Sequence, residues 1–254
     1  QVEYRNPFVL QLTTTAWLSM LFRGSPLLAT FCFCPLAASF KLLHVGAPRT
    51  GTQSIYDAME ILGFKPLHTG YSLEVRAPIC AYLFQNGPLN DALSVLEGYD
   101  AGMDEPLFLM YEELMAADPE SKFLLSVVDP ESWFQNYVKL VELLQLYENA
   151  TERSYLESLP PMCVGLKSWG CHFEVPTPEN KEACLRGLAR HNQRVQETIP
   201  PHRLLVYNWT DGWAPLCHFL GAAIPEVEFP HEDDVKETLE KRQAFSKMAW
   251  YPQI

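Results

Sequence analysis

The decisive stretch of this 254-residue chain is KLLHVGAPRTGTQS, residues 41–54. Its first five residues form a short apolar run, which predicts a buried strand. Beyond Gly51 the apolar residues recur at i, i+3, i+4 and i+7, the spacing of one helix face; they are Ile55, Ala58, Met59 and Leu62. A buried strand that passes through a glycine-containing turn into a helix is the opening unit of an α/β fold.

The rest of the chain alternates between strand and helix patterns. Buried strands are predicted over residues 64–68, 122–128 and 203–207. Helices are predicted over residues 52–62, 106–117, 132–147, 177–198, 213–220 and 232–248, the fifth capped by Asp211. Residues 123–128 are almost continuously apolar, as a parallel strand buried on both faces requires. We therefore expect a single α/β domain over residues 40–254, with three layers and a central parallel sheet flanked by helices.

Residues 1–39 differ from the rest of the chain. Between Asn6 and Phe40 the only charged residue is Arg23, yet neither apolar stretch reaches the 18 or so clean apolar residues of a membrane span. This apolar extension is either the remainder of a targeting signal, through which the protein would associate with a membrane, or a segment packed on the domain. The compartment stays open between the cytoplasm and a Golgi or other organelle membrane.

The charge balance and the cysteines exclude other classes of protein. There are 19 Lys and Arg against 31 Asp and Glu, a net charge of −12, so a general nucleic-acid-binding surface is excluded. One small basic pocket for an anionic ligand remains compatible with that charge. The seven cysteines form no C-x-x-C pair and no paired metal spacing. We expect no metal site and mostly free, buried thiols; the oligomeric state stays open.

The turn over residues 46–54 is a candidate anion site, because ligands of open parallel sheets bind beyond the carboxyl ends of the strands. The following helix directs its positive end at the same place. Gly46 and Gly51 have the G-x-x-x-x-G spacing of a P-loop, but Thr52 and Gln53 replace the Lys and Ser/Thr that should follow. Arg49 lies inside the loop instead. This combination suits a terminal sulfuryl or phosphoryl group next to a nucleotide and fits ATP–Mg²⁺ poorly; the alternative is a plain strand-to-helix turn.

An ordered set of short segments accompanies the loop. The segments are PRTGTQS (48–54), GMDEP (102–106), YEEL (111–114), KFLL (122–125), DPESWF (129–134), HN (191–192), RLLVY (203–207), DGW (211–213), PLC (215–217) and FPH (229–231). Together they resemble the P-loop sulfotransferase family, in the branch often mislabelled as nucleotide-sugar epimerases, from residue 41 to about residue 247. The resemblance implies a three-layer P-loop NTPase-like fold. It also implies sulfuryl transfer from PAPS (3′-phosphoadenosine 5′-phosphosulfate) to a hydroxyl or amine of a small-molecule or glycan acceptor.

The same resemblance assigns the donor site. The implied 5′-phosphosulfate-binding loop consists of Pro48, Arg49, Thr50, Gly51, Thr52, Gln53 and Ser54, with Arg49 also stabilising the leaving phosphate. The family holds the 3′-phosphate with an arginine at the end of the middle strand and a serine eight residues later. Those positions hold Val128 and Asn136 here, of which only Asn136 can donate a hydrogen bond. The departure leaves open a fold-retaining binding protein without transferase activity, or a replacement cation from Lys167, Arg153 or Arg186.

Sulfuryl transfer also needs a base that takes the acceptor's proton. The candidates are His68 at the end of the second predicted strand, Glu74 shortly after it, and Asp104 before the helix predicted at Pro106. The surroundings of Asp104 match the family best, although it also suits an N-cap. Three tryptophans are expected to pack in the core or at a strand edge rather than stack on adenine: Trp133, Trp209 and Trp213.

Overall fold

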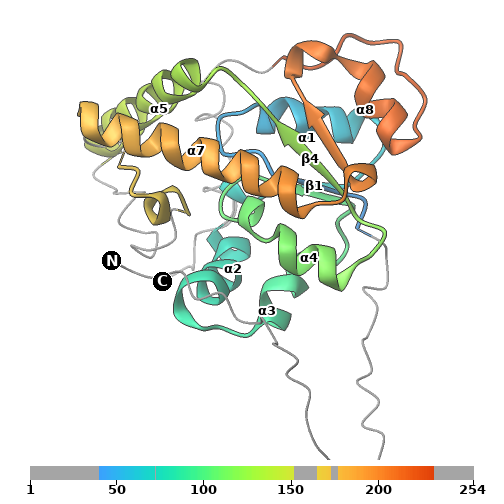
Figure 1. The fold of residues 1–254 in the computed structure, drawn as a ribbon, viewed down its shortest axis with the longest axis horizontal. Coiled ribbons are helices and arrows are strands. Elements are labelled where there is room, and N and C mark those ends of the chain that lie inside the picture. The colour runs from blue at the N-terminus through green and yellow to red at the C-terminus, as the bar shows by residue number, and fades with distance from the viewer. Residues whose placement is uncertain (1–39, 72, 152–164, 173–176, 232–254) are drawn as a thin grey trace, which may run out of the picture. The chain divides into compact units, whose positions relative to one another are not determined.

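The computed structural model describes residues 40–71, 73–151, 165–172 and 177–231 (Figure 1). The chain divides into two compact units, Gln1–Phe33 and Cys34–Ile254, and every element below belongs to the second. The apolar extension over residues 1–39 and the helix expected over residues 232–248 lie outside the described residues. Among the described helices, none combines the length and the apolar character needed to cross a bilayer.

A parallel sheet of five strands lies at the centre of the described part of the chain. The strands are β1 (Leu42–His44), β2 (Pro66–His68), β3 (Ala101–Met103), β4 (Lys122–Ser126) and β5 (Leu204–Tyr207). Their order is β2-β3-β1-β4-β5, and every adjacent pair is parallel. Since β1 lies between β3 and β4, the loop that leaves its carboxyl end lies at the centre of one sheet edge. The structure thus confirms the expected α/β class.

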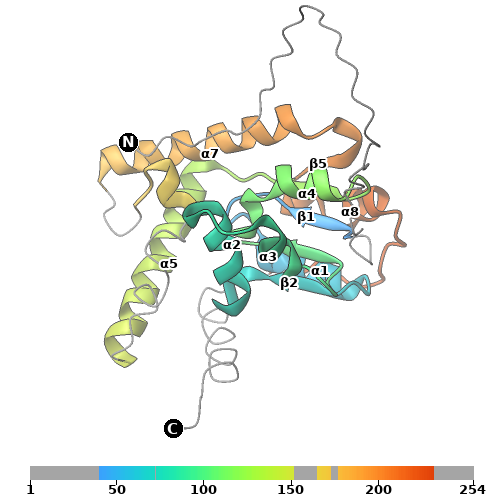
Figure 2. The same cartoon turned by 90° about the horizontal axis from the view of Figure 1, so that it is seen from below.

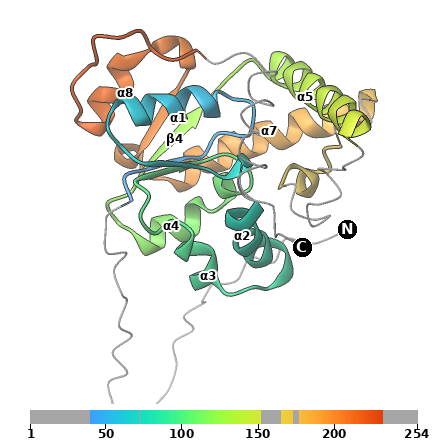
Figure 3. The same ribbon diagram turned by 180° about the vertical axis from the view of Figure 1, so that it is seen from behind.

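Helices cover both faces of this sheet (Figures 1 and 3). The α-helices are α1 (Thr52–Ile61), α2 (Leu73–Gln85), α3 (Leu89–Ser94), α4 (Tyr111–Ala117), α5 (Pro130–Thr151), α7 (Pro178–Thr198) and α8 (Trp213–Leu220). The 3₁₀ turns are η1 (Thr69–Tyr71), η2 (Leu107–Leu109), η3 (Gly165–Trp169), η4 (Pro201–Arg203) and η5 (Trp209–Asp211). On one face α1 and α8 pack on Leu42 and Leu124, and on the other α2, α3, α4 and α7 pack on Leu43, Phe123 and Leu125.

Helix α5 belongs to a third apolar cluster, which lies beyond the sheet. Trp133, Phe134 and Tyr137 of α5 pack there with Leu188 of α7 and with Leu166 of η3. Helices α5 and α7 cross near one another, as the view in Figure 2 also shows. The cluster also contains Ala47 of the β1–α1 loop, so it connects α5 and α7 to the edge of the sheet where the candidate site lies.

Several predicted helices are confirmed, together with the residues predicted to begin or end them. Helix α1 begins at Thr52, and Gly63 just beyond its end has a φ of 82°, which glycine adopts without a Cβ penalty. Helix α7 begins after Thr177, whose side chain accepts a hydrogen bond from the backbone N–H of Asn180. Helix α8 ends at Gly221 as predicted.

Other boundaries were wrong. The helix predicted from Pro106 is two elements, η2 and α4, because the tighter 3₁₀ turn directs Leu107 and Phe108 into different apolar clusters. The predicted strand over 122–128 ends at Ser126, where its neighbour β5 also ends. Asp211 does not cap α8, since its carboxylate accepts from the backbone N–H of Asn208, the N-cap of η5.

The prediction of buried strands was incomplete. Strand β5 is an edge strand in the described part of the sheet, so the side chain of Val206 is 45% exposed rather than buried. Strand β3 was missed, because three residues that include Gly102 give no apolar run. A Cβ at Gly102 would lie 2.5 Å from Leu107, so close packing against η2 requires glycine there.

The expectation of mostly free thiols was wrong for the described cysteines. Cys171 and Cys184 form a disulfide that joins the segment after η3 to α7, and Cys80 is also disulfide-bonded. Cys217 is free and buried, as expected. The sequence signal failed because this pairing is set by the packing of η3 on α7, whereas cysteine spacing alone does not reveal connectivity.

Candidate active site

The β1–α1 loop, residues 45–51, turns at the carboxyl end of the central strand. Arg49 has a φ of 67° and Gly51 a φ of 100°, so two left-handed residues give the loop its curvature. Gly51 is the N-cap of α1, and the helix has neither a side-chain cap nor an acidic residue in its first turn. The N–H groups and the positive end of the helix dipole are therefore not neutralised by a carboxylate of that turn, which suits an anion.

Buried hydrogen bonds hold this loop in place. The Thr50 hydroxyl donates to the carbonyl oxygen of Ala47 at 2.7 Å and lies 2.6 Å from Ser126 Oγ at the end of β4. Ser126 Oγ in turn lies 2.6 Å from Nε2 of His44 on β1. On the other side, the indole N–H of Trp133 on α5 donates to the Pro48 carbonyl oxygen at 2.8 Å. The loop is thus attached to two strands and one helix.

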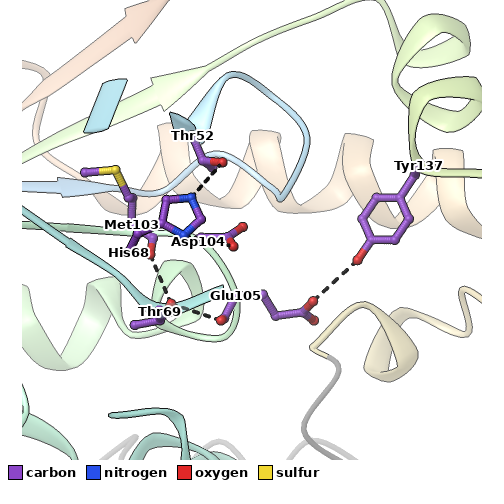
Figure 4. Close-up of polar contacts among 7 residues, drawn as sticks. All are labelled: Thr52, His68, Thr69, Met103, Asp104, Glu105 and Tyr137. Atoms are coloured by element: carbon purple, nitrogen blue, oxygen red, sulfur yellow. Dashed lines mark hydrogen bonds and ion pairs between the residues drawn. The ribbon is translucent and has the colours of Figure 1, made fainter. Parts of the chain in front are cut away.

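His68 and Asp104 meet beside the start of α1 (Figure 4). His68 ends β2 and Asp104 follows β3, and because these strands are adjacent and parallel, with His68 paired to Met103, both side chains reach one edge. Nδ1 of His68 lies 3.5 Å from Oδ2 of Asp104, and Nε2 lies 3.3 Å from the Thr52 hydroxyl oxygen. The side chains of His68 and Asp104 are only 3% and 7% exposed.

This arrangement places an imidazole between a carboxylate and the first residue of α1. A carboxylate that contacts the far nitrogen of a histidine orients the ring and stabilises the charge that the ring gains with a proton. His68 therefore fits the role of base, with Asp104 behind it. The alternative N-cap role of Asp104 is wrong, because the residue before η2 is Pro106 and the Asp104 carboxylate faces His68.

Two residues of this edge were missed from the sequence: Thr69 and Glu105. The Thr69 hydroxyl lies within hydrogen-bond distance of two carbonyl oxygens, those of Met103 at 3.0 Å and Glu105 at 2.9 Å (Figure 4). The buried Glu105 carboxylate accepts from the Tyr137 hydroxyl at 3.4 Å and from the Leu166 N–H at 3.3 Å. Thr69 directly follows His68 and Glu105 directly follows Asp104, each just beyond the carboxyl end of a strand. Because ligands of parallel sheets bind there, this position in the sequence could have indicated both residues.

His191 fixes α7 to the end of β1. Its Nε2 donates to the carbonyl oxygen of Val45 at 2.7 Å, and its ring lies against those of Phe108, Tyr111 and Trp169. Burial lowers the pKa of His191 to about 4, although the bond to Val45 opposes that shift. The ring is neutral at neutral pH and serves packing.

The remaining predicted residues lie on α1 and α5. The Gln53 amide donates to Asp57 at 2.8 Å, and Ser54 is buried in the first turns of α1. Asn136 is half-buried on α5, and Val128 packs against the third apolar cluster. Their roles as ligand contacts stay predictions.

The predictions for other residues had mixed outcomes. The side chains of Glu74, Arg153 and Lys167 lie outside the described residues, while Arg186 is exposed and paired with Glu182. The described residues contain no group of three or more His, Cys, Asp or Glu side chains arranged to hold a metal.

The tryptophans divide into two kinds. Trp133 and Trp213 are buried, as predicted. Trp209 is 40% exposed, and its Cβ lies 3.8 Å from where a Cβ on Gly51 would be. Trp209 is therefore an exposed aromatic residue and not a core residue. It lies beside the loop because it begins η5, which follows the carboxyl end of β5 at the same edge of the sheet. The ring of His231 packs edge-on against it, with the ring centroids 5.3 Å apart.

A loop suited to an anion at the centre of a parallel sheet, with a histidine–carboxylate pair beside it, forms the candidate group-transfer site. Comparison with known proteins identifies the class. The profile of the family described as "Sulfotransferase domain" matches residues 41–238, and the chain belongs to that family of transferases. It is also 31% identical over 214 residues to "Ava biosynthesis cluster protein M" of Aspergillus versicolor, an alignment that covers 75% of this chain and 80% of the relative.

Proposed function

We propose that the protein transfers a sulfuryl group from PAPS to a hydroxyl or amine of a small-molecule or glycan acceptor. The observation that carries this proposal is the position of the His68–Asp104 pair, 3.3 Å from Thr52 at the first turn of α1. A base that contacts the end of an anion-binding loop lies where an acceptor would meet a bound sulfuryl group. Family membership and the relative from a biosynthesis cluster support a transferase reaction, and a small-molecule acceptor fits that relative's name.

The residues of the loop fit a phosphosulfate donor. Gly51 and the uncapped first turn of α1 offer backbone N–H groups, and Arg49 supplies the cation within the loop. The Thr52 hydroxyl lies at the same helix start. PAPS supplies an activated sulfuryl group, which leaves the 5′-phosphate oxygen when the acceptor oxygen or nitrogen bonds to sulfur.

The protein's part in the reaction is then divided among four residues. His68 takes the proton of the acceptor hydroxyl or amine, and Asp104 stabilises the resulting imidazolium. Arg49 and the N–H of Gly51 stabilise the negative charge that develops on the departing phosphate.

Trp209 is the aromatic side chain that suits the nucleotide base. It lies beside Gly51 and exposes 40% of its surface, whereas the other two tryptophans considered are buried. A base stacked on an aromatic ring gains roughly 1–3 kcal/mol.

A second candidate function is a fold-retaining binding protein that does not transfer sulfate. It is favoured by Val128, which packs on an apolar cluster where the family has the arginine for the 3′-phosphate. Arg186, one possible substitute, is already paired with Glu182 on the surface of α7.

The test is PAP binding by calorimetry, together with transfer of radiolabelled sulfate from PAPS to a panel of phenols, aliphatic alcohols, amines and glycans. PAP is the 3′,5′-bisphosphate product. We expect His68→Gln to abolish transfer and leave PAP affinity unchanged, with His202→Gln, an exposed histidine of η4, as the matched control. Failure to transfer to any acceptor contradicts the first function, and weak or absent PAP binding beside it favours the second.

A further inference from the structure

His44 is a fully buried histidine within the central strand, at a position where a parallel strand normally has an apolar side chain. Its Nε2 lies 2.6 Å from Ser126 Oγ, which lies 2.6 Å from Thr50 Oγ1, which donates to the Ala47 carbonyl oxygen. The chain of bonds therefore begins in β1, crosses to the end of β4 and returns to the β1–α1 loop.

The direction of each bond follows from the number of protons. A carbonyl oxygen only accepts, so the single hydroxyl proton of Thr50 points to Ala47. Thr50 must then accept from Ser126, and Ser126, having given its proton, must accept from His44. His44 is therefore the Nε2–H tautomer, and burial, which lowers its pKa to about 3, keeps it neutral.

We propose that His44 and Ser126 are positioning residues of the donor site, which act through Thr50 to hold the β1–α1 loop open for the phosphosulfate. In this relay the Thr50 hydroxyl bonds within the protein, to Ala47 and Ser126, and not to the ligand. The proposal rests on the proposed function, because it names the residues that support that same site.

Two observations distinguish this relay from ordinary core packing. Nδ1 of His44 is buried and has no hydrogen-bond partner among the described residues, which costs free energy that an apolar side chain would not. We therefore infer that the imidazole is there for the hydrogen bond that its Nε2 donates. A Cβ on Gly46 would lie 2.5 Å from Ser126 Oγ, 2.7 Å from Thr50 Oγ1 and 2.9 Å from the His44 ring. The loop therefore begins with a residue that leaves room for the relay.

The test compares Ser126→Ala with Ser121→Ala. Both serines are buried at the ends of β4, but the Ser121 hydroxyl donates to the Phe40 carbonyl oxygen at the opposite edge of the sheet. The first readout is amide hydrogen exchange of residues 46–54 in the unliganded protein. We expect at least a tenfold faster exchange there in Ser126→Ala and no change in Ser121→Ala. Equal exchange in both variants overturns the proposal, whatever the protein binds.

The second readout is PAP affinity and, where transfer is measured, the KM for PAPS. We expect Ser126→Ala to weaken PAP five- to twentyfold and to raise KM more than it lowers kcat. His44→Leu should behave likewise without a loss of melting temperature, and His44→Gln, which keeps a donor for Ser126, should restore most of the affinity. If the wild-type protein binds no PAP, the proposed function fails while the exchange result still decides the relay; if it binds PAP and all variants bind equally, the relay is wrong.

Discussion

Val128→Arg is the substitution that most directly tests the donor site. Val128 lies two residues beyond the end of β4, half-buried against the cluster that contains Trp133. An arginine there can cover the same apolar surface with its stem while the guanidinium reaches solvent, so folding is retained. A charge-assisted hydrogen bond to the 3′-phosphate contributes about 1.5–3 kcal/mol, which corresponds to about one to two decades in PAP affinity.

The neighbouring Asp129 decides where in that range the effect falls. Its carboxylate accepts from the backbone N–H of Ser132 at 2.8 Å. Hydrogen bonds from the backbone and the side chain of Ser132 lower the pKa of Asp129, so Asp129 is ionised beside the new arginine. Because Asp129 competes for the guanidinium, we expect about one decade.

The assay for Val128→Arg is calorimetric titration with PAP and with adenosine 5′-phosphosulfate, which lacks the 3′-phosphate. We expect Val128→Arg to tighten PAP only. Gln135→Arg is the control, because it makes the same change of net charge, from −12 to −11, at an exposed position of α5. Equal tightening of both ligands, or of PAP by the control, would show that the 3′-phosphate does not lie near residue 128.

Four other outcomes follow from the structure. Arg49→Ala should weaken PAP by about 1.5–3 kcal/mol, measured by calorimetry, and unchanged affinity would place the site elsewhere. Trp209→Ala should cost roughly 1–3 kcal/mol in PAP affinity while inorganic pyrophosphate, which has no base, binds as before. Purified protein should release no phosphate from ATP or GTP with Mg²⁺, because the P-loop lysine is missing; a steady release that Arg49→Ala abolishes would refute this. Burial lowers the pKa of His44 to about 3 and that of His191 to about 4, so the unfolded chain, with histidines near 6.5, takes up more protons as the pH falls below 6.5. The free energy of unfolding in urea should fall by about 2 kcal/mol per histidine from pH 7 to pH 5, and a fall that His44→Gln does not reduce would count against it.

Local patterns were sufficient for the loop and for α1. Periodicity places Ile55, Ala58 and Met59 on one buried face, and Gly51 and Gly63 mark both ends of the helix. These features depend on residues fewer than ten positions apart, and the same holds for the N-cap of α7 and for Gly221 at the end of α8. The sequence therefore predicts the loop and α1, whereas β3, the strand that precedes Asp104, was missed.

Contacts between distant segments were not predictable in this way. His44 and Ser126 are 82 residues apart, and within an apolar run the histidine gives no sign of its partner. Strand order decides this contact, since β1 and β4 are adjacent only because the chain crosses from β3 to β4 over β1. The pairing of Cys171 with Cys184 and the contact of Glu105 with Tyr137 have the same origin.

The backbone around Asp104 is an argument for reading this edge as a functional site. Asp104 has a φ of 74°, a left-handed conformation that is uncommon for residues other than glycine. A Cβ on Gly70 would lie 2.1 Å from Oδ2 of Asp104, so the carboxylate occupies space that any other residue at position 70 would fill. The left-handed backbone of Asp104 and the glycine at position 70 thus both allow a buried carboxylate to lie 3.5 Å from His68. Stability alone does not explain such an arrangement, because a glycine at position 104 would relieve the strain. The proposed function does explain it, since a carboxylate at position 104 would support His68 as the base.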